Sequence, residues 1–235
     1  EVLFEVNGDV ARSIASITKV MTAVVLLEHE FDLSREVEVS ASDVRGARHT
    51  YLRAGDRARI DDLLHLMLIA SDNAAARTLA RTSPFGYDGF VQQMTAKAQE
   101  LGLDATRYAD PSGLDPENVS SALDMARLIA FASNDPRISA IMRKSEHRVV
   151  TGRRVITAHS TNRLLKSDVD VQGGKTGFIR SAGYCLATLL RLPQGDPIAV
   201  VVLGARSNAA RFMETRHLLN WVSSRTQSML GLAVE

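Results

Sequence analysis

The stretch SIASITKVMTAVVLLEHE, residues 13–30, combines an almost unbroken apolar run with a single lysine near its start. Its larger apolar side chains recur at helical spacing, and alanine, valine and leucine fill the faces between them, which predicts a helix buried on nearly every side. The apolar run ends before the roughly 20 residues that a bilayer span requires. We therefore expect this helix in the core of a globular domain, with Ser13 or Ser16 capping its N-terminus.

Lys19 is the residue in this helix that needs an explanation. If the helix opens at Ser16, Lys19 lies one turn further on and on the same face. One interpretation is a lysine whose aliphatic stem lies on apolar surface while its amine reaches water. The other is a buried lysine with a lowered pKa beside a serine hydroxyl, which is a base next to its nucleophile.

Composition restricts the other classes of function. The chain has 235 residues, and its 28 basic residues nearly balance its 27 acidic ones. Because there is no basic stripe or tail, neither nucleic acid nor a membrane surface is expected as a partner. The single cysteine, Cys185, lies in an apolar run and is expected to pack as a small core residue. The histidines fall at no zinc-like spacing, so neither a metal nor a cofactor is predicted.

The order of patterns predicts the fold class. A short strand is expected near residues 36–40, helices at 60–81 with a break at Ser71 and Asp72, at 89–101 and between 121 and 144, strands from 146 to 205, and a last helix at about 208–228. This predicts a single α/β (α+β) domain over residues 1–235. An antiparallel sheet lobe would take about 1–40 and 146–235, and an all-helical lobe of about 41–145 would be inserted in it.

Three short motifs carry candidate chemistry. They are S-x-x-K at residues 16–19, S-D-N at 71–73 and K-T-G at 175–177. Each has a structural explanation alone: Asp72 or Asn73 could cap the following helix, and Lys175 could be an edge-strand lysine before a turn. A second S-x-N copy stands at 160–162, but the first is preferred because it falls at a break between two helices. In this order, the three motifs are the set found in penicillin-binding proteins and class A β-lactamases.

Over nearly its whole length the chain resembles the D-alanyl-D-alanine carboxypeptidase family, the low-molecular-mass penicillin-binding proteins. The resembling segments include IASITKVMTA, MTAKAQELGL and DPSGLDPENVSSALDMARL. LIASDNAAARTLA, PFGYDGF and KTGFIRSAGYCL are most similar to its D-alanyl-D-alanine endopeptidase branch, the penicillin-binding protein 7 type. Family members have a strand ahead of the segment matching EVLFEVNGD, where this chain begins. The resemblance implies a penicillin-recognising serine-transpeptidase/β-lactamase-like fold, peptidoglycan peptides as substrates, β-lactams as covalent inhibitors and a bacterial periplasmic location.

The resemblance also implies a role for each motif residue. Ser16 would be the nucleophile and neutral Lys19 its base, while Ser71 would relay the proton to the leaving amine and Asn73 would hold the acyl-side amide. Lys175 would be a charged clamp on the substrate carboxylate and would lower the pKa of Lys19, and Thr176 would offer a hydroxyl to the same carboxylate beside Gly177. The amides of Ser16 and Phe178 would form the oxyanion hole. Arg206, after the last strand, is a further candidate for the carboxylate site.

Three further functions remain open from sequence. A class A β-lactamase needs a glutamate that activates the deacylating water, and the candidate in a comparable loop, Glu117, does not have the spacing or neighbours of that motif. We therefore expect slow deacylation of penicillins. The second is an esterase with the same serine and lysine, and the third is a non-catalytic peptidoglycan-binding module. The sequence does not separate carboxypeptidase from endopeptidase activity, and no membrane anchor is visible in it.

Overall fold

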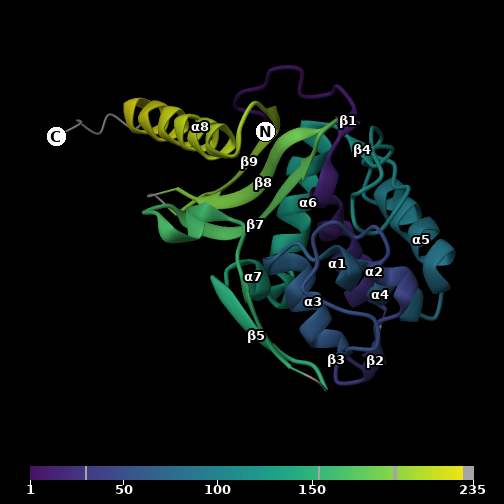
Figure 1. Cartoon of the computed structure of the whole chain (residues 1–235). Coiled ribbons are helices and arrows are strands. Elements are labelled where there is room, and N and C mark those ends of the chain that lie inside the picture. The colour runs from purple at the N-terminus through teal and green to yellow at the C-terminus, as the bar shows by residue number, and fades with distance from the viewer. Residues whose placement is uncertain (30, 153, 193–194, 230–235) are drawn as a thin grey trace.

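An antiparallel sheet forms one side of the molecule. The structure is a computed structural model that describes residues 1–29, 31–152, 154–192 and 195–229. Strands β7 (Asp170–Ile179), β8 (Gly183–Arg191) and β9 (Pro197–Ala205) lie side by side in that order. Helix α8 (Asn208–Met229) covers one face and α6 (Ala122–Asn134) the other (Figure 1). β8 is thus covered on both faces, which explains its continuous apolar sequence.

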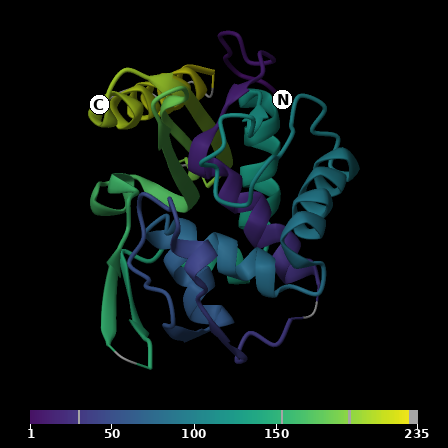
Figure 2. The ribbon, with the colours of Figure 1, turned by 45° about the vertical axis from the view of Figure 1, so that its right-hand side comes forward.

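The other side of the molecule is helical and is built around α1 (Thr18–Glu28). Helices α3 (Ile60–Ile69), α4 (Asn73–Thr82), α5 (Gly86–Glu100) and α6 pack against α1, which runs through the middle of this part (Figure 2). Every residue of α1 before Glu28 is buried, so the predicted all-round burial is confirmed. Burying each of its valines and leucines contributes about 1.5–3 kcal/mol, which fixes α1 in place.

Short elements complete the chain. They are α2 (Ala41–Val44), α7 (Pro136–Met142), the strand pairs β2 (Glu36–Glu38) with β3 (Arg57–Arg59), β5 (Glu146–Val150) with β6 (Val155–His159) and β1 (Arg12–Ser13) with β4 (Val119–Ser120), and the 3-10 turns η1 (Ala15–Ile17) and η2 (Arg163–Lys166). The predicted order of helices and strands, an α+β fold, is confirmed. None of the helices in the described ranges is both long and apolar enough to cross a membrane.

The division into two lobes is less sharp than the sequence suggests. Helix α6 lies within the segment predicted as the helical lobe, yet it contacts β8 and β9 as well as α1. Helix α6 therefore belongs to the interior of both parts. A boundary near residues 40 and 146 stays a prediction.

The start of the first helix differs from the prediction. Ser16 lies in η1, and α1 begins at Thr18 without a side-chain cap, so the expected cap by Ser13 or Ser16 is wrong. The reason is that the Ser16 hydroxyl is engaged by Lys19, while the Thr18 hydroxyl donates to the Ala15 carbonyl at 2.7 Å. At the second motif Asp72 does cap α4, because its carboxylate accepts from the Ala75 amide at 2.9 Å.

Two glycines let the backbone approach the Ser16 turn. A Cβ at Gly113 would overlap the Ala15 carbonyl oxygen, and Gly113 also has a φ of +79°. A Cβ at Gly177, on β7, would lie 2.7 Å from the Ile14 carbonyl oxygen and 3.1 Å from the Ser16 nitrogen. Since both contacts are with backbone, neither can be relieved by a side-chain rotation. The Ser16 turn is therefore held between the loop at Gly113 and the edge strand β7.

This packing predicts a large cost for Gly113→Ala. We expect a loss of at least about 3 kcal/mol in the free energy of unfolding, from left-handed backbone strain and the backbone clash together. Gly46→Ala is the matched control, because Gly46 has a φ of +64° with nothing within 4 Å of its Cβ position. Urea unfolding should show a loss of only about 1 kcal/mol for the control. Equal losses in the two variants would contradict the close approach.

Candidate active site

Lys19 joins three parts of the fold through its amine. Its Nζ lies 2.9 Å from Ser16 Oγ and 2.6 Å from Asn73 Oδ1, and it also contacts the Ser112 carbonyl oxygen. Its side chain is completely buried, and none of the described carboxylates pairs with it. The interpretation of Lys19 as a buried lysine beside a serine hydroxyl is therefore confirmed over the one in which its amine reaches water.

The partners of this amine determine its hydrogen-bonding direction. The Ser112 carbonyl and the Asn73 Oδ1 can only accept, and the orientation of the Asn73 amide is set by its Nδ2, which donates to the Ala47 carbonyl at 2.8 Å. A neutral amine has two N–H donors and one lone pair. Its two N–H groups would satisfy these carbonyl oxygens, which leaves the lone pair for the Ser16 hydroxyl. This is the arrangement of a base ready to accept the serine proton.

The pKa of Lys19 is lowered from the ordinary value of 10.5 to about 7, chiefly by burial and to a smaller extent by the nearby charge of Arg77. The carboxylates of Asp110 and Asp72 act in the opposite direction and raise it. Because desolvation is the largest cause, the all-apolar helix around the lysine is what makes it a base near neutral pH.

The loop at residues 110–118 positions the Ser112 carbonyl. The Asp110 carboxylate is its centre: it accepts from the Gly113 amide at 2.9 Å and from the Asp115 amide at 3.3 Å, and it also holds the Ser112 hydroxyl. The Asn118 carbonyl oxygen in turn accepts from the Ile14 amide at 3.1 Å. This loop is thus tied both to Lys19 and to the backbone just before Ser16.

The second motif projects from the break between α3 and α4. Asp72 is buried and holds the segment at Thr50 and Tyr51, accepting from the Tyr51 amide at 2.6 Å, and burial raises its pKa. Ser71 has a φ of +62°, an uncommon value for a residue with a side chain. Strained backbone of this kind persists where the surrounding contacts fix it, and it clusters at functional sites.

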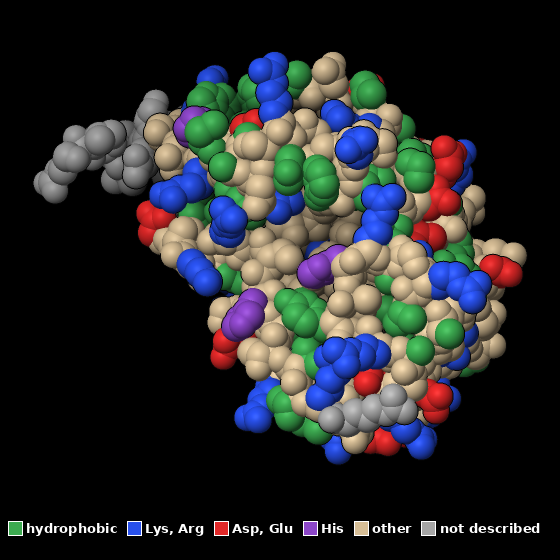
Figure 3. All heavy atoms as spheres, in the orientation of Figure 1, with side chains coloured by type: hydrophobic (Ala, Val, Ile, Leu, Met, Phe, Trp, Pro, Cys, Tyr) green, Lys and Arg blue, Asp and Glu red, His purple; other side chains and the backbone are tan. Residues whose placement is uncertain are grey.

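Ser71 and the third motif meet directly. Lys175 Nζ donates to Ser71 Oγ and to the Thr176 carbonyl oxygen, both at 2.9 Å. Burial lowers the pKa of Lys175 well below its usual value, and the positive charges of Lys19 and Arg211 lower it further. The Thr176 hydroxyl shares a 2.6 Å hydrogen bond with the Thr161 hydroxyl. The S-D-N and K-T-G motifs therefore line the same site as Ser16 and Lys19. Figure 3 shows the surface hollowed near β7, where the sheet meets the helical part.

Phe178 and Arg206 are the remaining candidates from the sequence. The Phe178 side chain is 51% exposed and stacks on Tyr184, its cross-strand partner, with ring centroids 4.2 Å apart. Arg206 follows β9 and is exposed, and its predicted role at a carboxylate stays a prediction. The cation that does reach β7 is Arg211 of α8, whose Nη1 donates to the Gly177 carbonyl at 2.9 Å. Burial lowers the pKa of Arg211 to about 10, so it stays charged at pH 7.

Sequence reasoning missed several residues around the site, namely Asp110, Ser112, Thr161 and Arg211. The signal for Thr161 was present, because it is the middle residue of the second S-x-N copy that we set aside. Asp110 acts through the hydrogen bonds that its carboxylate accepts, and Ser112 acts through its backbone carbonyl, and neither leaves a distinctive sequence pattern. Arg211 could only have been found from its position on the last helix relative to the K-T-G strand.

Fold and site together define a class of protein: an active-serine hydrolase of the penicillin-recognising type, with a lysine in the first turn of the helix that follows the serine. The chain belongs to the D-alanyl-D-alanine carboxypeptidase family, whose model matches residues 1–207. It is an enzyme of that family, a serine DD-peptidase acting on peptidoglycan. The family resemblance inferred from the three motifs is thereby confirmed.

Individual relatives agree with this assignment. The chain is 33% identical to the D-alanyl-D-alanine endopeptidase of Escherichia coli and 34% identical to that of Pseudomonas aeruginosa, over 95% of this chain and 74% of each relative. It is 34% identical to an Escherichia coli D-alanyl-D-alanine carboxypeptidase, DacC, over 94% of this chain and 58% of that protein. Among solved structures, the Streptomyces K15 DD-transpeptidase matches with a TM-score of 0.87 at 26% identity, covering 93% of this chain and 90% of that one.

The geometry predicts that Lys19→Met folds but loses acylation. Methionine fills the same apolar channel but offers no N–H to the buried oxygens of Asn73 and Ser112, so we expect a folded protein whose free energy of unfolding is lower by about 1–3 kcal/mol. The rate of Ser16 acylation by a reactive thioester or penicillin should fall by about 10²–10⁴, the usual contribution of a general base. A folded Lys19→Met protein that acylates at the wild-type rate would rule out this role.

The pKa of Lys19 predicts the pH dependence of acylation. The base form is lost as the pH falls through about 7, so below this value the rate should drop tenfold for each further pH unit. Below pH 7 the Lys19 amine is protonated in both the folded and the unfolded chain, so its titration does not change stability there. As the pH rises from about 7 to its unfolded pKa of about 10.4, stability increases. Stopped-flow acylation from pH 5 to 9, with a thermal melt in each buffer, separates these effects. A rate that stays flat down to pH 5 would contradict the assigned base.

Proposed function

We propose that the protein cleaves the peptide bond after a D-alanine of the peptidoglycan stem through an acyl-enzyme on Ser16. The observation that carries this proposal is the fully buried Lys19 amine 2.9 Å from Ser16 Oγ, without a carboxylate partner among the described residues. In the first step Ser16 Oγ attacks the D-alanine carbonyl carbon and Lys19 Nζ takes the hydroxyl proton. The carbonyl oxygen, now negative, is stabilised by the amides of Ser16 and Phe178.

Collapse of this intermediate breaks the peptide bond. The leaving nitrogen takes the hydroxyl proton of Ser71, and the proton that Lys19 took from Ser16 replaces it, so that Lys19 is neutral again. The Ser71 hydroxyl lies 2.9 Å from Lys175 Nζ, and its motif partner Asn73 lies 2.6 Å from Lys19 Nζ. Asn73 then holds the acyl-side amide. In the second half of the reaction water attacks the ester carbonyl carbon and gives its proton to neutral Lys19. The bond between that carbon and Ser16 Oγ then breaks, and Lys19 passes the proton to Ser16 Oγ, which restores both groups.

Lys175 and Thr176 hold the carboxylate of the leaving group in this proposal. The charged clamp on the substrate carboxylate stays a prediction, and burial and the neighbouring cations lower the pKa of Lys175 in the free site. A substrate carboxylate beside the amine reverses the balance, since an opposite charge favours the ammonium form. A bound substrate carboxylate therefore raises the pKa of Lys175 and stabilises its ammonium form.

We further propose endopeptidase activity on cross-linked stems, in the bacterial periplasm, as the particular function within the family. Two relatives of which this chain covers 74% are named D-alanyl-D-alanine endopeptidases, whereas it covers only 58% of the carboxypeptidase DacC, at a similar identity. A carboxypeptidase releases a single D-alanine, whereas an endopeptidase releases a second stem peptide. Both leaving groups offer Lys175 a carboxylate, so the core site serves either reaction.

A β-lactamase would share all three motifs, and the site argues against it. Glu117, the candidate for activating a deacylating water, is exposed and forms an ion pair with Arg107 at 2.7 Å. The carboxylates nearest Lys19, Asp72 and Asp110, accept several backbone and hydroxyl hydrogen bonds each. None of the carboxylates in the described part of the site is free to activate water, so the penicilloyl ester should persist.

Intact-mass spectrometry after incubation with benzylpenicillin tests this function. We expect a stable adduct of one penicillin on the wild-type protein and none on Ser16→Ala. Rapid loss of the drug without an adduct would identify a β-lactamase instead. An intact drug and no adduct would favour an esterase or a binding module.

A further inference from the structure

A groove on the α8 face of the sheet has no part in the chemistry described so far. It has a volume of about 510 Å³, within the range of ligand pockets. Helix α8 and the turn η2 form its walls, and its lining residues are Arg163, Leu164, Ser167, Ala209, Phe212, Met213, Arg216, His217 and Asn220. The groove thus combines an apolar floor with basic side chains, and its described lining includes no aspartate or glutamate.

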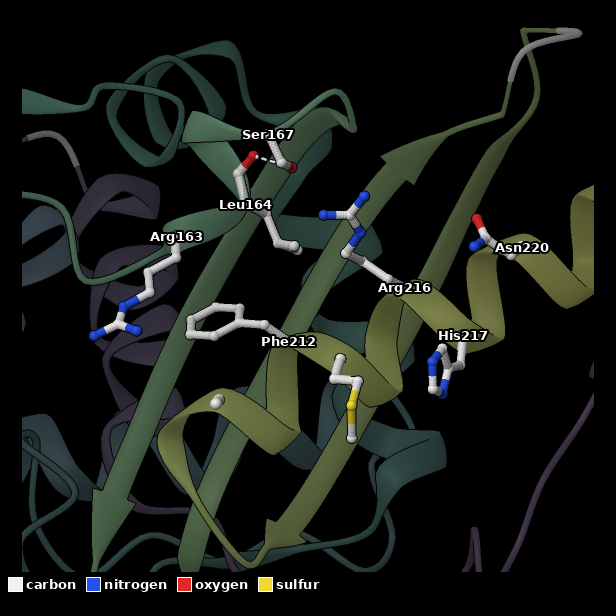
Figure 4. A pocket seen from close by; sticks show the side chains of 9 residues that line it. Arg163, Leu164, Ser167, Phe212, Arg216, His217 and Asn220 are labelled. Atoms are coloured by element: carbon white, nitrogen blue, oxygen red, sulfur yellow. Dashed lines mark hydrogen bonds between the residues drawn. The ribbon is translucent and has the colours of Figure 1, made fainter.

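The arrangement of the lining suits a peptide with acidic groups. Figure 4 shows the Phe212 ring and the Leu164 side chain between Arg163 and Arg216, with His217 and Asn220 further along α8. Leu164 and Phe212 are 2% and 7% exposed, so the floor is fixed by the core beneath it. Arg163 is exposed and forms no ion pair within the described ranges, while Arg216 pairs with Asp168 at 3.2 Å, where both side chains are exposed. Arg163 is therefore a guanidinium available to a carboxylate.

The groove begins beside the active site. Thr161, whose hydroxyl lies 2.6 Å from the Thr176 hydroxyl, precedes Arg163 by two residues, so their Cα atoms are at most about 7 Å apart. Arg163 is also near enough to Arg211 to lower the pKa of that side chain. Thr176 belongs to the end of the site that holds the leaving-group carboxylate in the proposed function. A leaving group longer than one residue would be directed from Thr176 toward Arg163.

We propose that this groove binds the leaving stem peptide of a cross-linked substrate, with Arg163 and Arg216 contacting its free carboxylates and Phe212 and Leu164 its aliphatic carbons. The inference rests on the proposed function, since it places the leaving group from Lys175 and Thr176. It identifies what separates the two reactions of the family on this chain. A single D-alanine ends at Thr176, whereas a second stem reaches the groove and gains binding energy there.

The experiment compares two substrates across charge-removing variants. Arg163→Gln, Arg216→Gln and the double variant are assayed with a cross-linked muropeptide dimer and with a monomeric pentapeptide stem ending in D-alanyl-D-alanine. Lys166→Gln is the matched control, because Lys166 is also an exposed cation of η2 but does not line the groove. Thermal melts verify the folding of each variant, and benzylpenicillin acylation reports on Ser16 independently of the groove.

We expect the double variant to lower kcat/KM for the dimer at least about tenfold, mainly through KM, because charge-assisted hydrogen bonds of the bound substrate are lost. Hydrolysis of the pentapeptide and penicillin acylation should stay within about twofold of wild type. A loss on the dimer no larger than that of Lys166→Gln, or an equal loss on both substrates, would overturn the inference. So would a wild-type protein that forms the penicillin adduct but does not cleave the dimer. Failure to form the adduct would instead overturn the proposed function.

Discussion

The burial of one amine is the constraint on which the rest of this structure depends. Placing Lys19 inside an apolar helix is unfavourable unless its polar atoms find partners, and a charged form is disfavoured most of all. The chain meets this requirement with Ser16 from the same helical segment, Asn73 from the start of α4 and the Ser112 carbonyl from the 110–118 loop. These three contacts bring together segments more than 90 residues apart in the chain. The contacts that join these segments as the helical part folds are thus the same contacts that position Lys19 as a base.

The sheet contributes the second half of the site through a similar close contact. Strand β7 passes so close to the Ser16 turn that only glycine fits at position 177, and this closeness places Lys175 against Ser71 and Phe178 beside the serine. Two buried lysines then share one site without a carboxylate partner for either among the described residues. Burial lowers the pKa of both, and the charge of Lys19 lowers that of Lys175 further. The site therefore favours an anionic group, and the carboxylate of a substrate can provide it.

Sequence reasoning recovered the elements and the chemistry because both leave local patterns. The all-apolar helix, the break at Ser71 and Asp72 and the terminal strands follow from periodicity, and the three motifs follow from residue type and spacing. The features that the sequence did not predict depend on contacts between segments that are distant in the chain. The serine cap of α1 was predicted wrongly because the Ser16 hydroxyl has a different partner, which sequence spacing does not reveal. Ser112 acts through its backbone, and Arg163 and Phe212 meet only because η2 and α8 pack together.

The central claim, that burial makes Lys19 a neutral base, can be measured directly. The chain has five lysines, so a lysine-labelled protein gives few side-chain NMR signals, and Lys19→Met identifies the one that belongs to Lys19. A pH titration of the Ser16→Ala protein, in which no acylation can occur, would follow this signal alone. The account predicts a midpoint near 7, about three pH units below an exposed lysine. A midpoint above 10 would show that the amine is charged at neutral pH, and Lys19 could not then take the proton of Ser16.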